Sequence, residues 1–150
     1  MKMRNVILIS LIALAPAALA ADFGIRAGQY REAGQEFVGV EMLLDAGVVN
    51  VNPNIEYNLD DNVTSGSANL DVTVDIAKFS SVTPYAGAGL GLLYVDDEIG
   101  GEETKLVGNL IGGVAFDLEF LKPYAQLKYF KTLEQGPHTD EFAVTIGLRF

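Results

Sequence analysis

The chain has 150 residues, with 20 Asp or Glu against 10 Lys or Arg, so its formal net charge is -10. Its mean hydropathy is +0.25 and 49% of its residues are hydrophobic, which excludes an acidic disordered segment, because such segments lack hydrophobic residues. The negative charge argues against nucleic-acid binding, since phosphates repel acidic surfaces. The absence of Cys excludes a disulfide scaffold, a thiolate metal site, a Cys nucleophile and a lipid-modified Cys. The length suggests one domain.

The first twenty residues have the pattern of a secretory signal peptide. Lys2 and Arg4 precede an apolar run over 6–14, a break over 15–17, and small residues at 18 and 20. We therefore predict a cleaved signal peptide over 1–20 and a mature domain over 21–150. A short membrane anchor is the less favoured alternative, because the run is too short to cross a bilayer core.

After Ala21 the chain repeats short segments in which apolar and polar residues alternate, each ended by Gly, Asn, Asp, Ser or Pro. The expected strands cover 23–30, about 37–45, about 49–59, roughly 67–77, 84–95, about 105–117, 123–131 and 141–150. The sixth is blurred, because Val107 and Ile111 share a face with Asn109. The number of strands is even, and most are roughly nine to eleven residues long, the length of a tilted membrane-spanning strand.

The connections between these segments alternate in character. Those after the second, fourth and sixth segments are mostly compact, whereas the others carry most of the acidic charge, including 60–61 and a nine-residue loop over 96–104. Short turns at one end and longer polar loops at the other are typical of an up-and-down outer-membrane barrel. The expected fold class is all-β, an eight-stranded antiparallel transmembrane β-barrel.

Alternation alone does not say which face is wet, because a lipocalin-like soluble barrel would turn its apolar row inward. The polar row is rich in Asn and poor in Lys, which suits a hydrogen-bonded interior. Its members are Arg26, Glu41, Asn52, Asn54, Glu56, Asn69, Asp71, Asp75, Lys128 and Arg149. The last segment places apolar residues at every second position up to Phe150, as in the assembly signal of outer-membrane barrels. We therefore expect the apolar row to face lipid.

The 14 Phe and Tyr residues fall in connections or near segment ends, which predicts two interfacial aromatic belts. Tyr85 and Tyr124 are among the expected belt residues. Phe37 does not fit, because it lies on the polar face, and it predicts either a bulge or a shifted strand boundary.

Over the whole mature chain the sequence resembles the small eight-stranded outer-membrane barrels, meaning the opacity-protein-like family and the barrel domain of outer-membrane protein A. The most specific matching pieces are Thr83-Pro84-Tyr85-Ala86-Gly87-Ala88-Gly89-Leu90-Gly91 and Val144-Thr145-Ile146-Gly147-Leu148-Arg149-Phe150. The resemblance implies an outer-membrane location, a packed interior and a structural or surface role. The short loops depart from the pattern of the adhesins in this family.

Catalytic chemistry is not expected. The only His is His138, in the last connection, and Ser65 and Ser67 are the serines expected near the same rim, whereas Ser80 and Ser81 lie in a turn at the other end. A loop His that is simply solvated is the favoured interpretation over a His–Ser pair of a lipid-modifying enzyme. No cofactor-binding or metal-binding motif is present, and the alternating glycines over 87–91 are unlike a dinucleotide fingerprint.

Acidic residues between the fifth and sixth segments allow two interpretations. Asp96, Asp97, Glu98, Glu102 and Glu103 supply oxygen ligands through which a divalent cation would bridge lipopolysaccharide phosphates. The favoured alternative is a solvated loop, because the ligand spacing is irregular.

The inner row allows either a plug or a pore. We expect a plug, because eight strands leave room only for side chains. Arg26, Lys128 and Arg149 would then pair with Glu41, Glu56, Asp71 or Asp75. The expected partners are outer-membrane lipid, lipopolysaccharide and, through the last strand, the barrel-assembly machinery, with the protein a monomer. A small pore for ions or small solutes is the alternative function, and a soluble periplasmic lipocalin-like barrel is less favoured.

Overall fold

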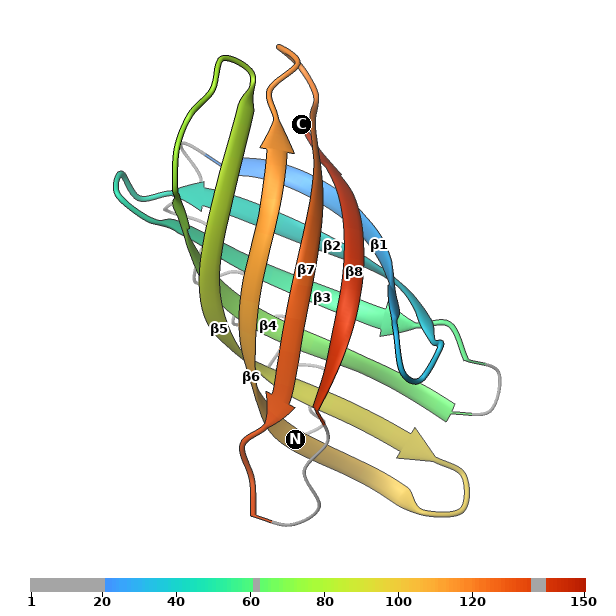
Figure 1. The fold of residues 1–150 in the computed structure, drawn as a ribbon. Coiled ribbons are helices and arrows are strands. Elements are labelled where there is room, and N and C mark those ends of the chain that lie inside the picture. Colours follow the sequence, from blue (N-terminus) through green and yellow to red (C-terminus); the bar gives the residue numbers. More distant parts are fainter. Residues whose placement is uncertain (1–20, 61–62, 136–139) are drawn as a thin grey trace.

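The structure, a computed structural model, describes residues 21–60, 63–135 and 140–150, so the predicted signal peptide over 1–20 lies outside the described residues. Eight strands form one closed antiparallel barrel in which each strand pairs with its neighbours in the chain, and the last pairs with the first (Figure 1). They are β1 (Ala21–Tyr30), β2 (Glu36–Asp45), β3 (Asn50–Asn58), β4 (Val63–Asp75), β5 (Val82–Asp97), β6 (Gly101–Phe116), β7 (Lys122–Thr132) and β8 (Asp140–Arg149). In the described part of the chain, no helix has the length and apolar character to cross a membrane. The all-β eight-stranded fold predicted from the sequence is confirmed.

Barrel closure shifts the strands along one another. A path across directly paired residues runs from Ala21 through Leu44, Val51, Val72, Ala88, Leu110, Tyr129 and Phe142, and it returns at Arg31, the residue after β1. The path therefore returns about ten residues from its start, which for eight strands at ordinary spacings tilts them by about 40° from the barrel axis. At that tilt, eight residue steps along β8, from Phe142 to Phe150, rise about 20 Å, close to the height of an outer-membrane apolar band.

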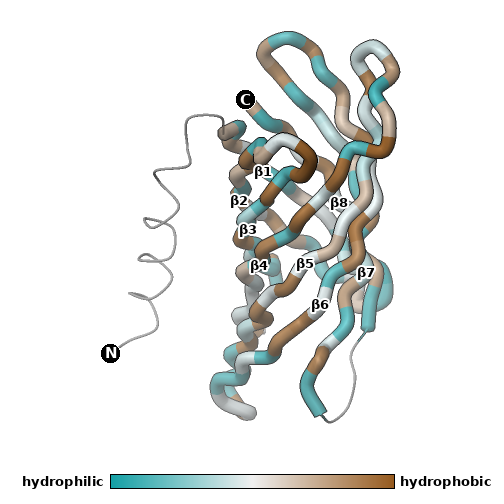
Figure 2. Tube along the Cα trace, turned by 90° about the vertical axis from the view of Figure 1, so that its left-hand side faces the viewer, coloured by the Kyte–Doolittle hydropathy of each residue, from teal (hydrophilic) through white to brown (hydrophobic). Residues whose placement is uncertain are grey.

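The apolar row faces outward on all eight strands. Leu110 and Ile146 are 61% and 63% exposed, whereas Thr145, next to Ile146, is fully buried inside. Figure 2 shows this as alternating hydrophobic and hydrophilic residues along the tube. An apolar exterior around a polar interior is the reverse of a lipocalin-like soluble barrel, so that alternative is not favoured.

The aromatic residues divide into an inner and an outer set, which corrects the sequence analysis. Five of the 14 point into the barrel: Tyr30, Phe37, Tyr85, Tyr124 and Phe130. The prediction of a bulge or boundary shift at Phe37 is wrong, because Phe37 keeps regular pairing with Gly28 and Asn58. Placing Tyr85 and Tyr124 in the belts is also wrong.

The other nine aromatic residues do form two belts. Phe23, Phe79, Phe116, Phe120 and Phe150 lie at the end of the short turns, and Tyr57, Tyr94, Tyr129 and Phe142 lie toward the loop end.

At the loop end, one side of the barrel wall extends further than the other. The strands β4, β5 and β6 have 13, 16 and 16 residues, against nine to eleven in each of the other strands. The β5–β6 pairing continues to Asp97 and Gly101, whereas the β6–β7 pairing stops at Val107 and Thr132. The predicted loop over 96–104 is therefore mostly strand, and the β5–β6 hairpin, together with the start of β4, rises roughly 10 to 15 Å above β3 and β7 at the loop end. This hairpin lies at the lower right in Figure 1.

Candidate functional site

The polar interior is the candidate functional site, and Glu56 on β3 is its most heavily bonded carboxylate. Lys128 Nζ, reaching across the barrel from β7, lies 2.8 Å from both Glu56 oxygens. Arg26 Nη2 lies 3.2 Å from Glu56 Oε1. The Tyr30 hydroxyl donates to Oε2 at 3.2 Å, and the Ser67 hydroxyl donates to the same oxygen at 3.4 Å. Because Glu56 is only 1% exposed, these donors replace the water that its charge would otherwise require.

A second carboxylate, Glu41 on β2, joins the opposite end of the network. Arg149 Nε on β8 donates to Glu41 Oε1 at 2.9 Å, and Asn52 donates to Oε2 at 2.9 Å. Arg26 Nη1 lies 3.4 Å from the same Oε2. Tyr124 covers the Arg149 guanidinium, with its ring centroid 4.0 Å from Cζ. Arg26 thus links the two carboxylates. The ion pairs form one continuous series across the interior, in the order Arg149, Glu41, Arg26, Glu56 and Lys128.

Amide side chains hold the third carboxylate, Asp71 on β4. Asn54 and Asn109 donate to its two oxygens at 2.9 and 3.1 Å. Asn109 also donates to Asn69, which donates in turn to Ser67, a residue bonded to Glu56. Two amide nitrogens, from β3 and β6, thus satisfy the hydrogen-bonding needs of a carboxylate that forms no ion pair with a described basic residue. The amides connect this carboxylate to the ion pairs.

The glycines of β5 make room for these polar groups. The three alternate glycines of the run face inward opposite Thr73, Asp71 and Asn69 of β4, their direct pairing partners. A Cβ at Gly89 would meet the Asp71 carboxylate, and one at Gly91 would meet the Asn69 amide. The segment Thr83–Gly91, which resembles other barrels in sequence, therefore forms the wall against which the amide network packs.

The charges within the network balance. The buried basic residues are Arg26, Lys128 and Arg149, and the acidic residues bonded into the network are Glu41, Glu56 and Asp71. A further buried acid, Glu141, accepts the backbone N–H groups of Glu32 and Ala33 at the loop end. Three charges of each sign attract one another in a medium of low dielectric, which favours a closed interior over a solvated channel.

Aromatic clusters close the interior on both sides of the network. Toward the loop end Phe37, Tyr30 and Phe130 pack together, with ring centroids 5.1 and 5.4 Å from that of Tyr30. Toward the turn end Tyr85 and Tyr124 pack with Ile111.

Each of three inward aromatic rings lies over a glycine that pairs directly with it on the neighbouring strand. The pairs are Phe37 with Gly28, Tyr85 with Gly113, and Tyr124 with Gly147, and a Cβ at any of these glycines would meet the ring. This arrangement fills the space that a glycine leaves and fixes the register of the paired strands.

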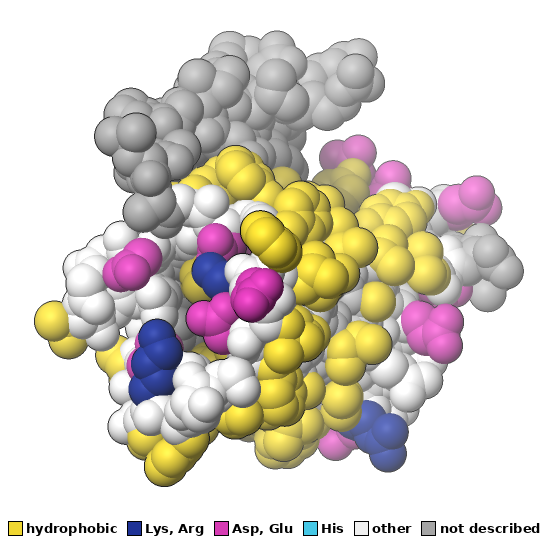
Figure 3. Space-filling view, turned by 90° about the horizontal axis from the view of Figure 1, so that it is seen from above, with side chains coloured by type: hydrophobic (Ala, Val, Ile, Leu, Met, Phe, Trp, Pro, Cys, Tyr) yellow, Lys and Arg dark blue, Asp and Glu magenta, His cyan; other side chains and the backbone are white. Residues whose placement is uncertain are grey.

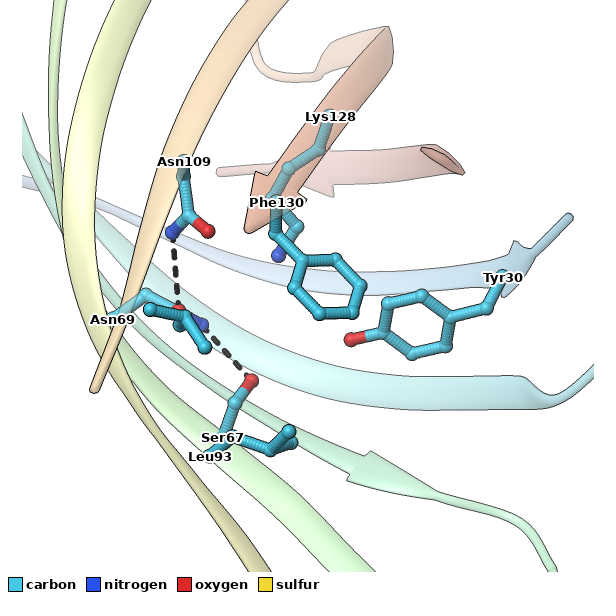
Figure 4. A pocket seen from close by; sticks show the side chains of 8 residues that line it. Tyr30, Ser67, Asn69, Leu93, Asn109, Lys128 and Phe130 are labelled. Carbon is cyan, nitrogen blue, oxygen red and sulfur yellow. Dashed lines mark hydrogen bonds between the residues drawn. The ribbon is translucent and has the colours of Figure 1, made fainter. Parts of the chain in front are cut away.

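The remaining space inside the barrel is small. A cavity of about 10 Å³, shown in Figure 4, is lined by Tyr30, Asn109, Lys128 and Phe130 among others. That volume holds about one water molecule. A larger hollow of about 180 Å³ opens at the turn end, where charged side chains gather at the mouth among hydrophobic ones (Figure 3). The described interior is therefore packed rather than open.

The predicted pairing of the inner charges is confirmed in part. Arg26, Lys128 and Arg149 pair with Glu41 and Glu56 as expected. Asp71 is bonded by amides instead of a basic residue. Asp75, the other acid named as a possible partner, is not used: β4 ends there, and its exposed carboxylate accepts from Asn50 at 3.3 Å and forms no ion pair with a described basic residue.

The residues weighed for catalysis are not brought together in the described part of the chain. His138 lies outside the described residues. Ser65 and Ser67 point into the barrel, where Ser65 accepts from Asn58 at 2.7 Å. Ser80 lies in the turn at the opposite end.

The acidic residues weighed for cation bridging lie on the raised hairpin. Asp96 pairs directly with Glu102, and Val95 with Glu103, along the β5–β6 ladder. Among the described residues, no group of three carboxylate or His side chains is placed to hold a metal ion. Asp61 lies outside the described residues, and Asp60 accepts from Gln35 at 2.9 Å.

Two interior residues that form hydrogen bonds, Asn109 and Tyr30, were missed from the sequence. Gln126 also points inward and accepts from Tyr85, on the polar face where the alternation places it with Lys128. The blurred alternation of the sixth segment was the available signal, because Val107, Asn109 and Ile111 share the inner face.

Comparison with known proteins identifies the fold. The structure is similar to the N-terminal β-barrel domain of OprF from Pseudomonas aeruginosa, with a TM-score of 0.71 and 17% identity, over 87% of this chain and 96% of that one. It is equally similar to Neisserial surface protein A, with a TM-score of 0.71 and 14% identity, over 86% and 94% of the two chains. The designed barrel TMB2.3 follows, with a TM-score of 0.57 and 14% identity, over 87% and 92%. No protein-family model and no curated protein matches the sequence. The chain thus has the fold of the small eight-stranded outer-membrane barrels.

Proposed function

We propose that this chain is an integral outer-membrane β-barrel protein whose interior is plugged and whose role is structural or in surface interaction. The observation that carries the proposal is the combination of an apolar exterior with a charge-balanced, densely bonded interior. An apolar surface that continues around eight strands is far larger than soluble monomers expose. Such a surface requires lipid, and a closed barrel is one of two structures that cross lipid with all backbone groups satisfied.

The partners follow from the same surfaces. The outer row contacts the acyl chains of phospholipid and lipopolysaccharide, between the two aromatic belts. The segment over 1–20 directs export, and β8 with Phe150 is the strand that the barrel-assembly machinery recognises. The barrel acts as a monomer, because β1 and β8 pair with each other and leave no free edge around the body of the barrel.

Measurements of conductance and of lipid-modifying activity separate this function from a pore and from an enzyme. A mature chain refolded in detergent should migrate differently on a gel before and after boiling and should give little or no steady current in planar bilayers. Substituting His138→Ala should change neither property. Large, stable single-channel steps would establish a pore instead, and acyl transfer or lipid hydrolysis that disappears in the His138→Ala variant would establish an enzyme. A mature protein that stays soluble without detergent would contradict the membrane location itself.

A further inference from the structure

The raised part of the barrel has an unpaired strand edge. We define the raised sheet as residues 63–66 of β4, 93–97 of β5 and 101–106 of β6, the part that stands above the other strands at the loop end. Within it β5 pairs on both sides, with β4 and with β6. Pairing of β6 with β7 has already stopped at Val107, so within the described residues β6 is the edge of the raised sheet.

Backbone hydrogen-bonding groups on this edge are directed outward. The carbonyl of Leu106 accepts the N–H of Leu133, and the N–H of Leu106 donates to Glu134 Oε1 at 3.2 Å, so the backbone of Leu106 faces away from β5. Because a strand repeats every two residues, Thr104 and Glu102 present their N–H and C=O groups on the same side. On that side, facing away from β5, no residue in the described part of the chain pairs with either. Such an edge is a template for an added strand.

Charge on the raised sheet determines which strand fits. Acidic side chains flank the edge and the hairpin tip: Asp96, Asp97, Glu98, Glu102 and Glu103. The basic residue among them, Lys105, lies 3.4 Å from Glu103. Ile99 at the tip is 98% exposed and offers one apolar contact. A second copy of this edge would bring like charges together, so the charges oppose self-association and favour a basic strand.

We propose that the edge of β6 at Glu102 and Thr104 is a docking site for an extended, basic segment of another protein, which adds to the raised sheet as a further strand. Backbone hydrogen bonds from Thr104 and Glu102 hold the segment, and the surrounding carboxylates select its charge. The inference deepens the proposed function, because it requires that the loop end of the barrel is in water outside the membrane.

A synthetic peptide that alternates Lys and Val is a suitable probe. The mature barrel is refolded in uncharged dodecyl maltoside micelles, so that no charged lipid competes for the peptide. Binding is measured by calorimetry, and amide hydrogen exchange at Thr104 and Glu102 is measured by NMR. Saturating peptide should slow exchange at both amides, whereas a peptide that alternates Glu and Val should not bind. A Lys–Val peptide methylated on the backbone amides of both edges should bind at least about tenfold more weakly, because neither edge can then donate to β6.

Substitution of Thr104 separates strand addition from simple charge attraction. Thr104→Pro removes an N–H that faces away from β5, so the β5–β6 ladder keeps its bonds and the hairpin should still form. This variant should bind the Lys–Val peptide at least about tenfold more weakly, whereas Thr104→Val, which keeps the N–H, should bind like the parent. Gel mobility before and after boiling checks that both variants fold.

Three results would overturn the docking site. These are equal affinity for the methylated and unmethylated peptides, parental affinity of the Thr104→Pro variant, and slowed exchange at Thr104 in lipopolysaccharide micelles without peptide, which would mean that lipid covers the edge. Each leaves the gel-mobility and conductance tests of the barrel unaffected, so failure of the docking site is distinguishable from failure of the proposed function.

Discussion

Replacing Lys128 by Met tests whether the interior ion pairs hold the barrel closed. The substitution removes a cation that lies 2.8 Å from both oxygens of Glu56 and leaves that buried carboxylate with Arg26 as its remaining charged partner. At 2.8 Å and an effective dielectric constant of about 20, the attraction between two unit charges is about 6 kcal/mol, part of which only offsets the loss of hydration. We expect the free energy of unfolding to fall by about 3 kcal/mol.

The double variant Lys128→Met with Glu56→Gln supplies the decisive comparison. It removes one charge of each sign and restores the balance of the network, so it should lose clearly less stability than the two single losses added together. Lys122→Met is the matched control, because its 2.7 Å pair with Asp22 is equally short but partly exposed, and it should lose less than about 1 kcal/mol.

Urea unfolding from phospholipid vesicles measures these losses. It is followed by far-UV circular dichroism and gel mobility, because the chain has no Trp. Equal small losses in Lys128→Met and Lys122→Met, or strict additivity in the double variant, would refute the idea that the buried pair stabilises the barrel.

Three further predictions concern packing, a turn and assembly. Gly147→Ala places a methyl group against the Tyr124 ring and should cost about 1–3 kcal/mol or lower the refolding yield, whereas Gly112→Ala, which meets nothing within 4 Å, should be near neutral in the same urea assay. Glu119 adopts a positive φ of 62°, so Glu119→Gly should raise the free energy of unfolding by up to about 1 kcal/mol, and Glu119→Ala should not, which thermal melts of the two variants will compare. Phe150→Ser should lower the amount of barrel in isolated outer membranes far more than a loop substitution does, and equal amounts would show that this residue plays no part in assembly.

Local alternation was enough to predict the number, order and sidedness of the strands. The row from Phe142 to Phe150 alternates without interruption, and such a pattern depends only on the period of a strand. Strand ends were less predictable at the loop end. The acidic stretch from Asp96 to Glu103 has the composition of a loop, yet antiparallel pairing carries both strands of the hairpin through it.

Register was the information that the sequence did not supply. Alternation placed Phe37 on the polar face, but its own strand could not show why a ring fits there, because the space is left by Gly28, a residue of the neighbouring strand. The amide network was missed for a related reason, since Asn109 and Asp71 lie on different strands and meet only over Gly89 of the strand between them. Charge pairing was easier, because three basic residues on a buried face leave few acidic partners.

The distribution of the six network charges along the chain has a consequence for how the barrel forms. The first four strands carry Arg26 and all three acids, a sum of −2, whereas the last four carry Lys128 and Arg149, a sum of +2. The two halves of the chain therefore have opposite charge on the surfaces that become the interior, and neither half can neutralise its own. In the closed barrel Lys128 reaches β3 and Arg149 reaches β2. We therefore expect the interior charges to attract the late strands to the early ones while the sheet is still open, before the backbone bonds between β1 and β8 form.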